Sequence, residues 1–80
     1  MDPMTTIDTS NFLPHQLRVV QEKADLDVKL AALESFIAGD IFPTINKAEQ
    51  DHLVRQSEAM KQYSSILGER IAIFAGPVSD

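Results

Sequence analysis

The first half of the chain carries one row of apolar residues at steps of three and four. Neither glycine nor proline interrupts residues 15–38, and this spacing is that of one face of a helix. Pro14 suits the first turn of such a helix, and Gly39 suits its end. The pattern therefore predicts a helix over residues 14–38. Its apolar row is Val19, Leu26, Leu30, Leu33 and Ile37.

The second half shows two series of residues that repeat every seven positions. They interleave at alternating steps of three and four, which predicts one helix over residues 46–75 with both series on the same face. Because burying an amide or a guanidinium without a partner costs several kcal/mol, we expect the polar members to find hydrogen bonds or to line a pocket. The apolar series is Leu53, Met60, Leu67 and Phe74, and the polar series is Gln56, Tyr63 and Arg70.

A short connection joins the two predicted helices. Asn46 with Glu49 three residues later forms a capping box that opens the second helix. Two long helices joined by so brief a connection lie antiparallel. We therefore predict an all-α fold, an antiparallel two-helix hairpin over residues 13–76. A flexible N-terminal segment, residues 1–12, precedes it, and we interpret residues 1–3 as an appended leader.

Size and composition indicate that the hairpin associates with copies of itself. A chain of 80 residues buries too little surface to be more than marginally stable alone. It has no cysteine for a disulfide, and its two histidines lie in no zinc-binding pattern. A further apolar row on the second helix, Ala59, Ile66 and Ile73, lies beside the hairpin face. We expect it to contact another subunit in a homo-oligomeric helical bundle.

The charge narrows the possible partners. A net charge of −5 argues against binding duplex nucleic acid, whose affinity comes mostly from neutralising phosphates. A small anionic ligand is compatible with this charge if a few cations converge. No apolar run approaches the length of a membrane span, and no signal peptide is recognisable, so we expect a cytoplasmic protein without membrane contact. No metal or other cofactor is expected.

The polar series has two interpretations. In the first it is a structural network, in which Glu22 or Asp25 pairs with Arg70 while Gln56 fixes the register of the two helices. In the second these groups line pockets between subunits and hold a small polar ligand. Arginine would then bind phosphate, tyrosine would stack on a base, and glutamine would bind a base or ribose edge.

Two segments resemble a family of small bacteriophage proteins related to an early gene of crAss-like phages. They are "RVVQEKADLDVKLAALESFI" and "EQDHLVRQSEAMKQYSSILGERIAIF". The chain is also loosely similar to the helical-hairpin proteins with which phages counter CBASS and Thoeris immunity. The resemblance implies an oligomeric sponge that sequesters a cyclic nucleotide signal of the host defence without hydrolysing it.

The resulting hypothesis is a phage anti-defence protein that binds an anionic nucleotide at pockets between subunits. An enzyme is not expected, because the sequence offers no nucleophile–base pair and no glycine-rich phosphate loop. The alternative is a small acidic helical inhibitor or adaptor that binds a host protein and displays Asp25, Asp27 and Glu34. The predicted ligand-binding residues are His15, Arg18, Glu22, Lys29, Gln56, Tyr63 and Arg70.

Overall fold

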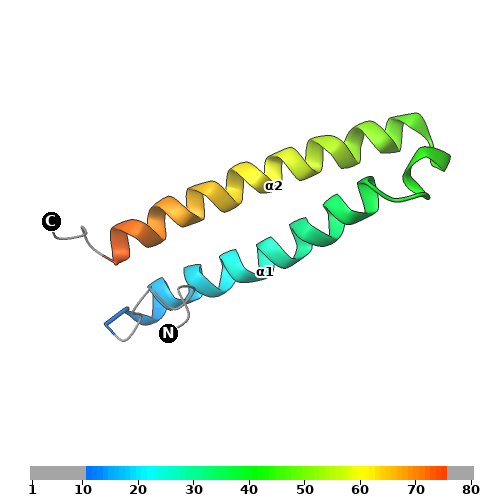
Figure 1. The fold of residues 1–80 in the computed structure, drawn as a ribbon. Helices are drawn as coiled ribbons and strands as arrows, with labels where there is room; N and C mark the ends of the chain where they lie inside the picture. The colour runs from blue at the N-terminus through cyan, green and yellow to red at the C-terminus, as the bar shows by residue number, and fades with distance from the viewer. Residues whose placement is uncertain (1–10, 76–80) are drawn as a thin grey trace, which may run out of the picture.

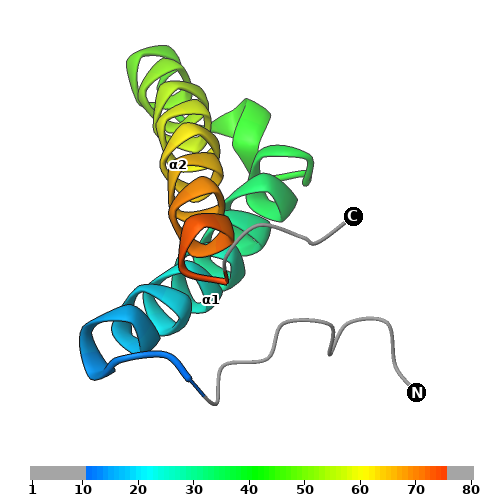
Figure 2. The same cartoon turned by 90° about the vertical axis from the view of Figure 1, so that its left-hand side faces the viewer.

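The computed structural model describes residues 11–75 as two long helices joined by a short one. The first long helix, α1, spans Pro14–Ile37, the 3₁₀ turn η2 spans Phe42–Thr44, and α2 spans Lys47–Phe74. The long helices run antiparallel side by side (Figure 1), with their axes inclined to one another (Figure 2). The predicted helical hairpin is therefore confirmed. The predicted leader, and residues 1–10 of the predicted flexible segment, lie outside the described residues.

Side chains and backbone groups close the first turn of each long helix. At α1 the backbone N–H of Leu13 donates to the side-chain oxygen of Gln16 over 2.8 Å. At α2 the Asn46 side chain accepts hydrogen bonds from the backbone N–H groups of Ala48, at 2.7 Å, and Glu49, at 3.4 Å. These bonds satisfy donors that a helix start would otherwise leave unpaired, so they fix where each helix begins.

The connection between the helices is held by contacts to both of them. The Gln50 side chain donates to the backbone carbonyl of Ile45 over 2.9 Å, and the rings of Phe36 and Phe42 meet edge to face at 6.4 Å between centroids. Nearby, Lys61 Nζ lies 3.1 Å from a Glu34 carboxylate oxygen and so joins α2 to α1. These contacts set the end of the hairpin at which the chain reverses.

The buried core lies toward the opposite, open end of the hairpin. Within residues 11–75, three apolar side chains are buried, Val19 on α1 and Leu67 and Ile71 on α2. Phe12 and Phe74 pack beside them with their rings edge to face, 6.1 Å between centroids. The hairpin thus has a small hydrophobic core, and much of its other apolar surface remains accessible.

The face that α2 turns toward α1 differs from the predicted one. Its members alternate at steps of four and three: Leu53, Ser57, Met60, Ser64, Leu67, Ile71 and Phe74. The apolar series is therefore placed as predicted. The polar series is not, because Gln56, Tyr63 and Arg70 are all exposed. Each lies one residue before a member of the observed face, about 100° around the helix. The expectation that they share the buried face is wrong.

A polar cluster occupies the helix interface where the polar series was expected. Lys23 Nζ lies 2.8 Å from Asp27 on α1 and donates to Ser64 Oγ on α2 over 3.0 Å. The Ser64 hydroxyl in turn donates to the other Asp27 oxygen. Within residues 11–75, no buried side-chain nitrogen or oxygen lacks a partner. Serine is small enough to let α1 come close, and its hydroxyl is satisfied by α1, so the interface tolerates a polar group here.

This cluster favours the ionised form of Asp27. The hydrogen bond from Lys23 and then that from Ser64 lower the pKa of the Asp27 carboxyl below its ordinary value of 3.8, against a smaller opposing effect of burial. Hydrogen bonds to a carboxylate stabilise its charged form relative to its neutral form. Asp27 therefore contributes to the hairpin as an anion.

Neither helix within residues 11–75 combines the length and the apolar character needed to cross a membrane.

Candidate functional site

A groove runs along one flank of the hairpin, between α1 and the middle of α2. It has a volume of about 460 Å³, within the range of small-molecule sites. Its walls come mainly from one face of α1, because residues at steps of three and four stand on the same side of a helix. The lining residues are Arg18, Gln21, Glu22, Asp25, Leu26, Lys29 and Tyr63.

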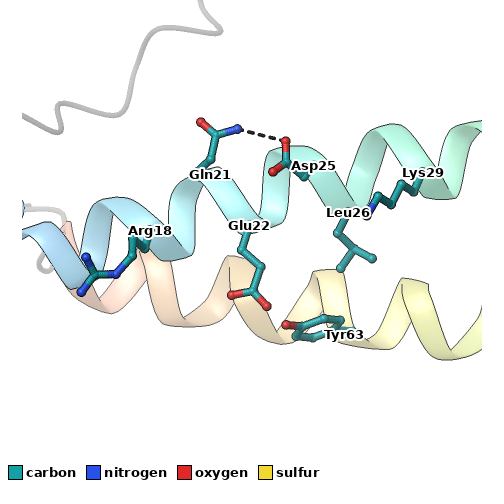
Figure 3. A pocket seen from close by; sticks show the side chains of 7 residues that line it. All are labelled: Arg18, Gln21, Glu22, Asp25, Leu26, Lys29 and Tyr63. Carbon is teal, nitrogen blue, oxygen red and sulfur yellow. Dashed lines mark hydrogen bonds between the residues drawn. The ribbon is translucent and has the colours of Figure 1, made fainter.

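The side chains divide the groove into a centre and two ends (Figure 3). In the centre the Glu22 carboxylate points toward the Tyr63 hydroxyl, and Leu26 points toward α2 beside it. Arg18 and Lys29 stand at opposite ends, eleven residues apart, which is about 16 Å along the helix axis. The groove thus has one cation at each end, with an aromatic ring and a carboxylate between them.

Within residues 11–75, the cations of this groove have no ion-pair partner, unlike most of the other cations there. Lys23, Lys47 and Lys61 each form an ion pair with a carboxylate. Arg18 and Lys29 form neither an ion pair nor a hydrogen bond with any described side chain, and their side chains are exposed. Two unpaired cations on one flank are available to bind an anionic ligand.

The two acidic residues of the groove differ in the hydrogen bonds that they form. Asp25 accepts a hydrogen bond from the Gln21 side chain over 3.0 Å, and both side chains point away from α2 in Figure 3. Glu22 has no hydrogen bond or ion pair to another described residue. Glu22 is therefore the carboxylate that remains able to accept hydrogen bonds from a ligand in the centre of the groove.

Four of the seven predicted ligand-binding residues line this groove, and three do not. His15 lies exposed in the first turn of α1. The guanidinium of Arg70 lies 6.0 Å from the ring centroid of Phe74, near the open end of the hairpin. The Gln56 amide contacts Met60 Sδ at 3.9 Å. One hairpin therefore does not bring His15, Gln56 and Arg70 into the groove.

The groove also has three lining residues that the sequence did not single out as binding residues. Gln21 and Asp25 are four residues apart, a spacing that favours a side-chain pair on one helix face, and Leu26 belongs to the apolar row of α1. The only sequence signal for these lining residues was the line of charged residues beside the apolar row of α1. It predicts a charged flank but not that the flank forms a groove, which depends on where Tyr63 stands.

Within residues 11–75, no three His, Asp or Glu side chains come together as a metal site.

The fold and the groove define a class, a small all-helical hairpin protein with two exposed cations and an aromatic ring on one flank. The particular family follows from comparison with known proteins. A family model described as Sequestin matches residues 13–73, and the chain belongs to this family. The family name suggests the sequestering of a ligand.

One relative comes from a bacteriophage. The chain is similar to an uncharacterized 7.5 kDa protein of Enterobacteria phage T4, from the denB-rIIB intergenic region. The two are 39% identical over 63 residues, which is 79% of this chain and 98% of the relative. No solved structure matches. These comparisons support a small phage protein, and the narrower resemblance to a crAss-like phage group stays a prediction.

Proposed function

We propose that this chain is a phage anti-defence protein that binds a cyclic nucleotide signal of host immunity and withdraws it from solution without altering it. Membership of the Sequestin family supports the sequestering part of the proposal. The observation that carries the ligand class is the groove, in which the unpaired Arg18 and Lys29 flank Tyr63. A nucleotide presents the complementary groups, namely phosphates, a flat base and ribose hydroxyls.

Each groove residue has a role in this proposal. Arg18 and Lys29 bind phosphate oxygens, which cations recognise by charge-assisted hydrogen bonds. Tyr63, 42% exposed, offers its ring to a base, and stacking on an aromatic side chain is worth about 1–3 kcal/mol. Glu22 accepts hydrogen bonds from ribose hydroxyls, a role that acidic side chains take in nucleotide sites. In this proposal the phosphates, the base and the ribose of a nucleotide are each bound by different groove residues.

A second copy of the chain is part of the proposal, because the groove of a single hairpin is open to solvent. Ligand sites commonly enclose most of their ligand. Ile66 and Ile73 on α2 are 47% and 76% exposed, and with Ala59 they form an apolar row next to the line of Tyr63 and Arg70. A neighbouring subunit packed on this row adds a second wall beside Tyr63. His15, Gln56 and Arg70 would then reach ligands only at such junctions.

Sequestration requires affinity and no chemical step. The closest pairing of a hydroxyl with a carboxylate in the described residues, Ser64 with Asp27, lies within the helix interface and is shared with Lys23. That serine serves the packing of the two helices rather than facing the groove. The proposal therefore assigns no catalytic residue.

The charge arrangement favours a ligand over the alternative of an acidic inhibitor of a host protein. An inhibitor that mimics a charged surface needs free acids, yet the three acids expected to form that surface are engaged. Asp25 accepts from Gln21, and Asp27 belongs to the cluster with Lys23. Glu34 pairs with Lys61. The groups of the groove flank without a partner among the described residues are two cations, Arg18 and Lys29, the ring of Tyr63 and a single carboxylate, that of Glu22.

Calorimetric titration with cyclic dinucleotides, cyclic trinucleotides and cyclic ADP-ribose isomers tests the proposal. We expect one of these classes to bind, and Arg18→Gln to weaken it about tenfold or more, the loss of one charge-assisted hydrogen bond. Lys47→Gln is the charge-matched control, because Lys47 is an exposed cation at the start of α2, outside both the groove and the row of Ile66 and Ile73. Absence of binding to every compound by folded protein, or equal effects of the two substitutions, contradicts the proposal.

A further inference from the structure

An exposed aromatic ring lies beyond the Lys29 end of the ligand groove. Lys29 and Phe36 are seven residues apart on α1, so they share a side of the helix and stand about 10 Å apart along its axis. Leu33 lies between them, at steps of four and three, and is half-buried. The flank that carries Arg18 and Lys29 therefore continues past the groove to Phe36, toward the closed end of the hairpin where α1 ends (Figure 1).

Exposure distinguishes Phe36 and Tyr63 from the other aromatic rings of residues 11–75. Phe36 is 38% exposed and Tyr63 is 42% exposed, whereas Phe12, Phe42 and Phe74 are half-buried. The Phe36 ring is held by an edge-to-face contact with Phe42, with an interplanar angle of 88°. One such contact fixes a ring and leaves part of its surface free to stack on another flat group. Both rings that the fold leaves accessible thus stand on the groove flank.

The groove flank alternates cations with rings along its length. Figure 3 shows Tyr63 between Arg18 and Lys29, and Phe36 follows Lys29 along α1. The order from the open end of the hairpin to the closed end is therefore cation, ring, cation, ring. Phosphates and bases alternate in the same way in an oligonucleotide, and proteins that bind such chains combine cations for the backbone with aromatic rings for the bases.

The surroundings of Phe36 suit a base rather than a further phosphate. Gln56 lies two turns before Tyr63 on the antiparallel helix α2, which brings it to the level of Phe36 on the same flank. Its amide contacts Met60 Sδ at 3.9 Å, and neither side chain is charged. Glu34 stands about 160° around α1 from Phe36 and pairs with a lysine of α2. An aromatic ring among uncharged groups favours a flat, neutral partner.

We infer that Phe36 is a second base-stacking residue, so that the groove flank binds a ligand with two bases joined through phosphates, as in a cyclic dinucleotide. This inference rests on the proposed function and narrows its ligand class. Tyr63 stacks on one base, Lys29 binds a phosphate between the two bases, and Phe36 stacks on the second.

The distance between the rings is what selects two bases. Atoms in stacking contact lie about 3.5–4 Å apart, and Phe36 stands about 10 Å beyond Lys29 along the axis while Tyr63 stands on the other side of that lysine. One base therefore cannot contact both rings. A ligand with a single base, such as a cyclic ADP-ribose isomer or a cyclic mononucleotide, leaves Phe36 without a partner.

Calorimetric titration with the cyclic dinucleotide and the cyclic mononucleotide of the same base, adenine and guanine in turn, tests the inference. We expect one dinucleotide to bind at least about tenfold more tightly than its mononucleotide, the worth of a second stacked base. Phe36→Leu should remove about this factor from dinucleotide binding and leave mononucleotide binding unchanged. Absence of binding by both dinucleotides, or equal affinities for dinucleotide and mononucleotide, overturns the inference.

Phe42→Leu is the matched control for Phe36→Leu. It removes the same contact between the two rings, but from the half-buried ring of η2. If Phe36 serves only to pack on Phe42, both substitutions weaken dinucleotide binding equally, and the second stacking residue is ruled out. If Arg18→Gln weakens binding while Phe36→Leu does not, the proposed function stands and this inference alone fails.

Nuclear magnetic resonance of the unsubstituted protein gives a readout that requires no variant. We expect the ring resonances of Phe36 to shift when the dinucleotide binds and to stay unchanged when the mononucleotide binds, because a stacked base alters the magnetic environment of the ring it covers. The resonances of Tyr63 should shift with both. Unshifted Phe36 resonances in the presence of bound dinucleotide overturn the inference.

Discussion

At the scale of single residues, the two buried serines of α2 have different roles despite equal burial. Ser64 bonds across the interface to Lys23 and Asp27, whereas Ser57 donates to the carbonyl of Val54 within its own helix, at 2.8 Å. We predict that Ser64→Ala lowers the free energy of unfolding by about 1 kcal/mol, the worth of a lost hydrogen bond. Ser57→Ala is the control and costs less, because alanine also favours helix. Chemical denaturation measures both, and equal losses contradict the assigned roles.

The Asp27 carboxyl makes the stability of the hairpin depend on pH. Its pKa is lowered in the folded chain by Lys23 and Ser64, so the folded state holds the proton less tightly than the unfolded state. The contribution is present above the ordinary value of 3.8 and is lost as the pH falls through the folded pKa. We predict that acidification below about pH 5 destabilises the wild type more than Asp27→Asn. Parallel loss in both proteins over this range contradicts the prediction.

At the scale of the helices, the start of α2 depends on one side chain. The Asn46 oxygen accepts two backbone N–H bonds at the first turn. We predict that Asn46→Ala costs about 1 kcal/mol of stability, a usual value for an N-terminal cap, while Asn46→Asp retains it because aspartate caps equally well. Thermal unfolding followed by circular dichroism measures the difference. If Asn46→Ala and Asn46→Asp behave alike, the connection is held by Gln50 and Phe42 rather than by the cap.

The sequence predicts the elements well, because long apolar rows bounded by Pro14 and Gly39 leave little alternative to helix. It does not decide which flank of α2 meets α1. The row from Leu53 to Phe74 has a polar neighbour on one side, Tyr63, and a small one on the other, Ser64. Spacing alone treats both as members of the face. The partner helix decides, because Lys23 and Asp27 satisfy the serine hydroxyl and leave the tyrosine ring outside.

The candidate groove depends on the same feature, namely that Ser64 and not Tyr63 faces α1. The charged row of α1 was visible in the sequence, since Arg18, Glu22 and Lys29 lie beside its leucines. Which residue of α2 would face this row could not be read from spacing, because it depends on the register of the two helices. With Ser64 turned inward, Tyr63 stands at the groove, and Arg70 lies against Phe74 instead. The heptad pattern groups Tyr63 with Arg70, but the register of the two helices places only Tyr63 at the groove.

At the scale of the whole molecule, a single hairpin leaves its groove and much of its apolar surface uncovered. Its groove is open, and large apolar side chains such as Val28 and Ile73 are largely exposed on two different sides. We propose that a contact between copies on the row of Ile66 and Ile73 completes it. In that assembly the grooves lie beside subunit junctions, which is where a ligand can be enclosed.

The most direct test of sequestration is equilibrium dialysis of the intact protein against the cyclic nucleotide that binds in calorimetry, followed by denaturation and chemical analysis of the recovered compound. The account predicts that free nucleotide falls in proportion to the protein added, and that all of it returns unchanged when the protein is unfolded. Free nucleotide that stays constant in the presence of folded protein, or a recovered compound that has been cleaved, would contradict it.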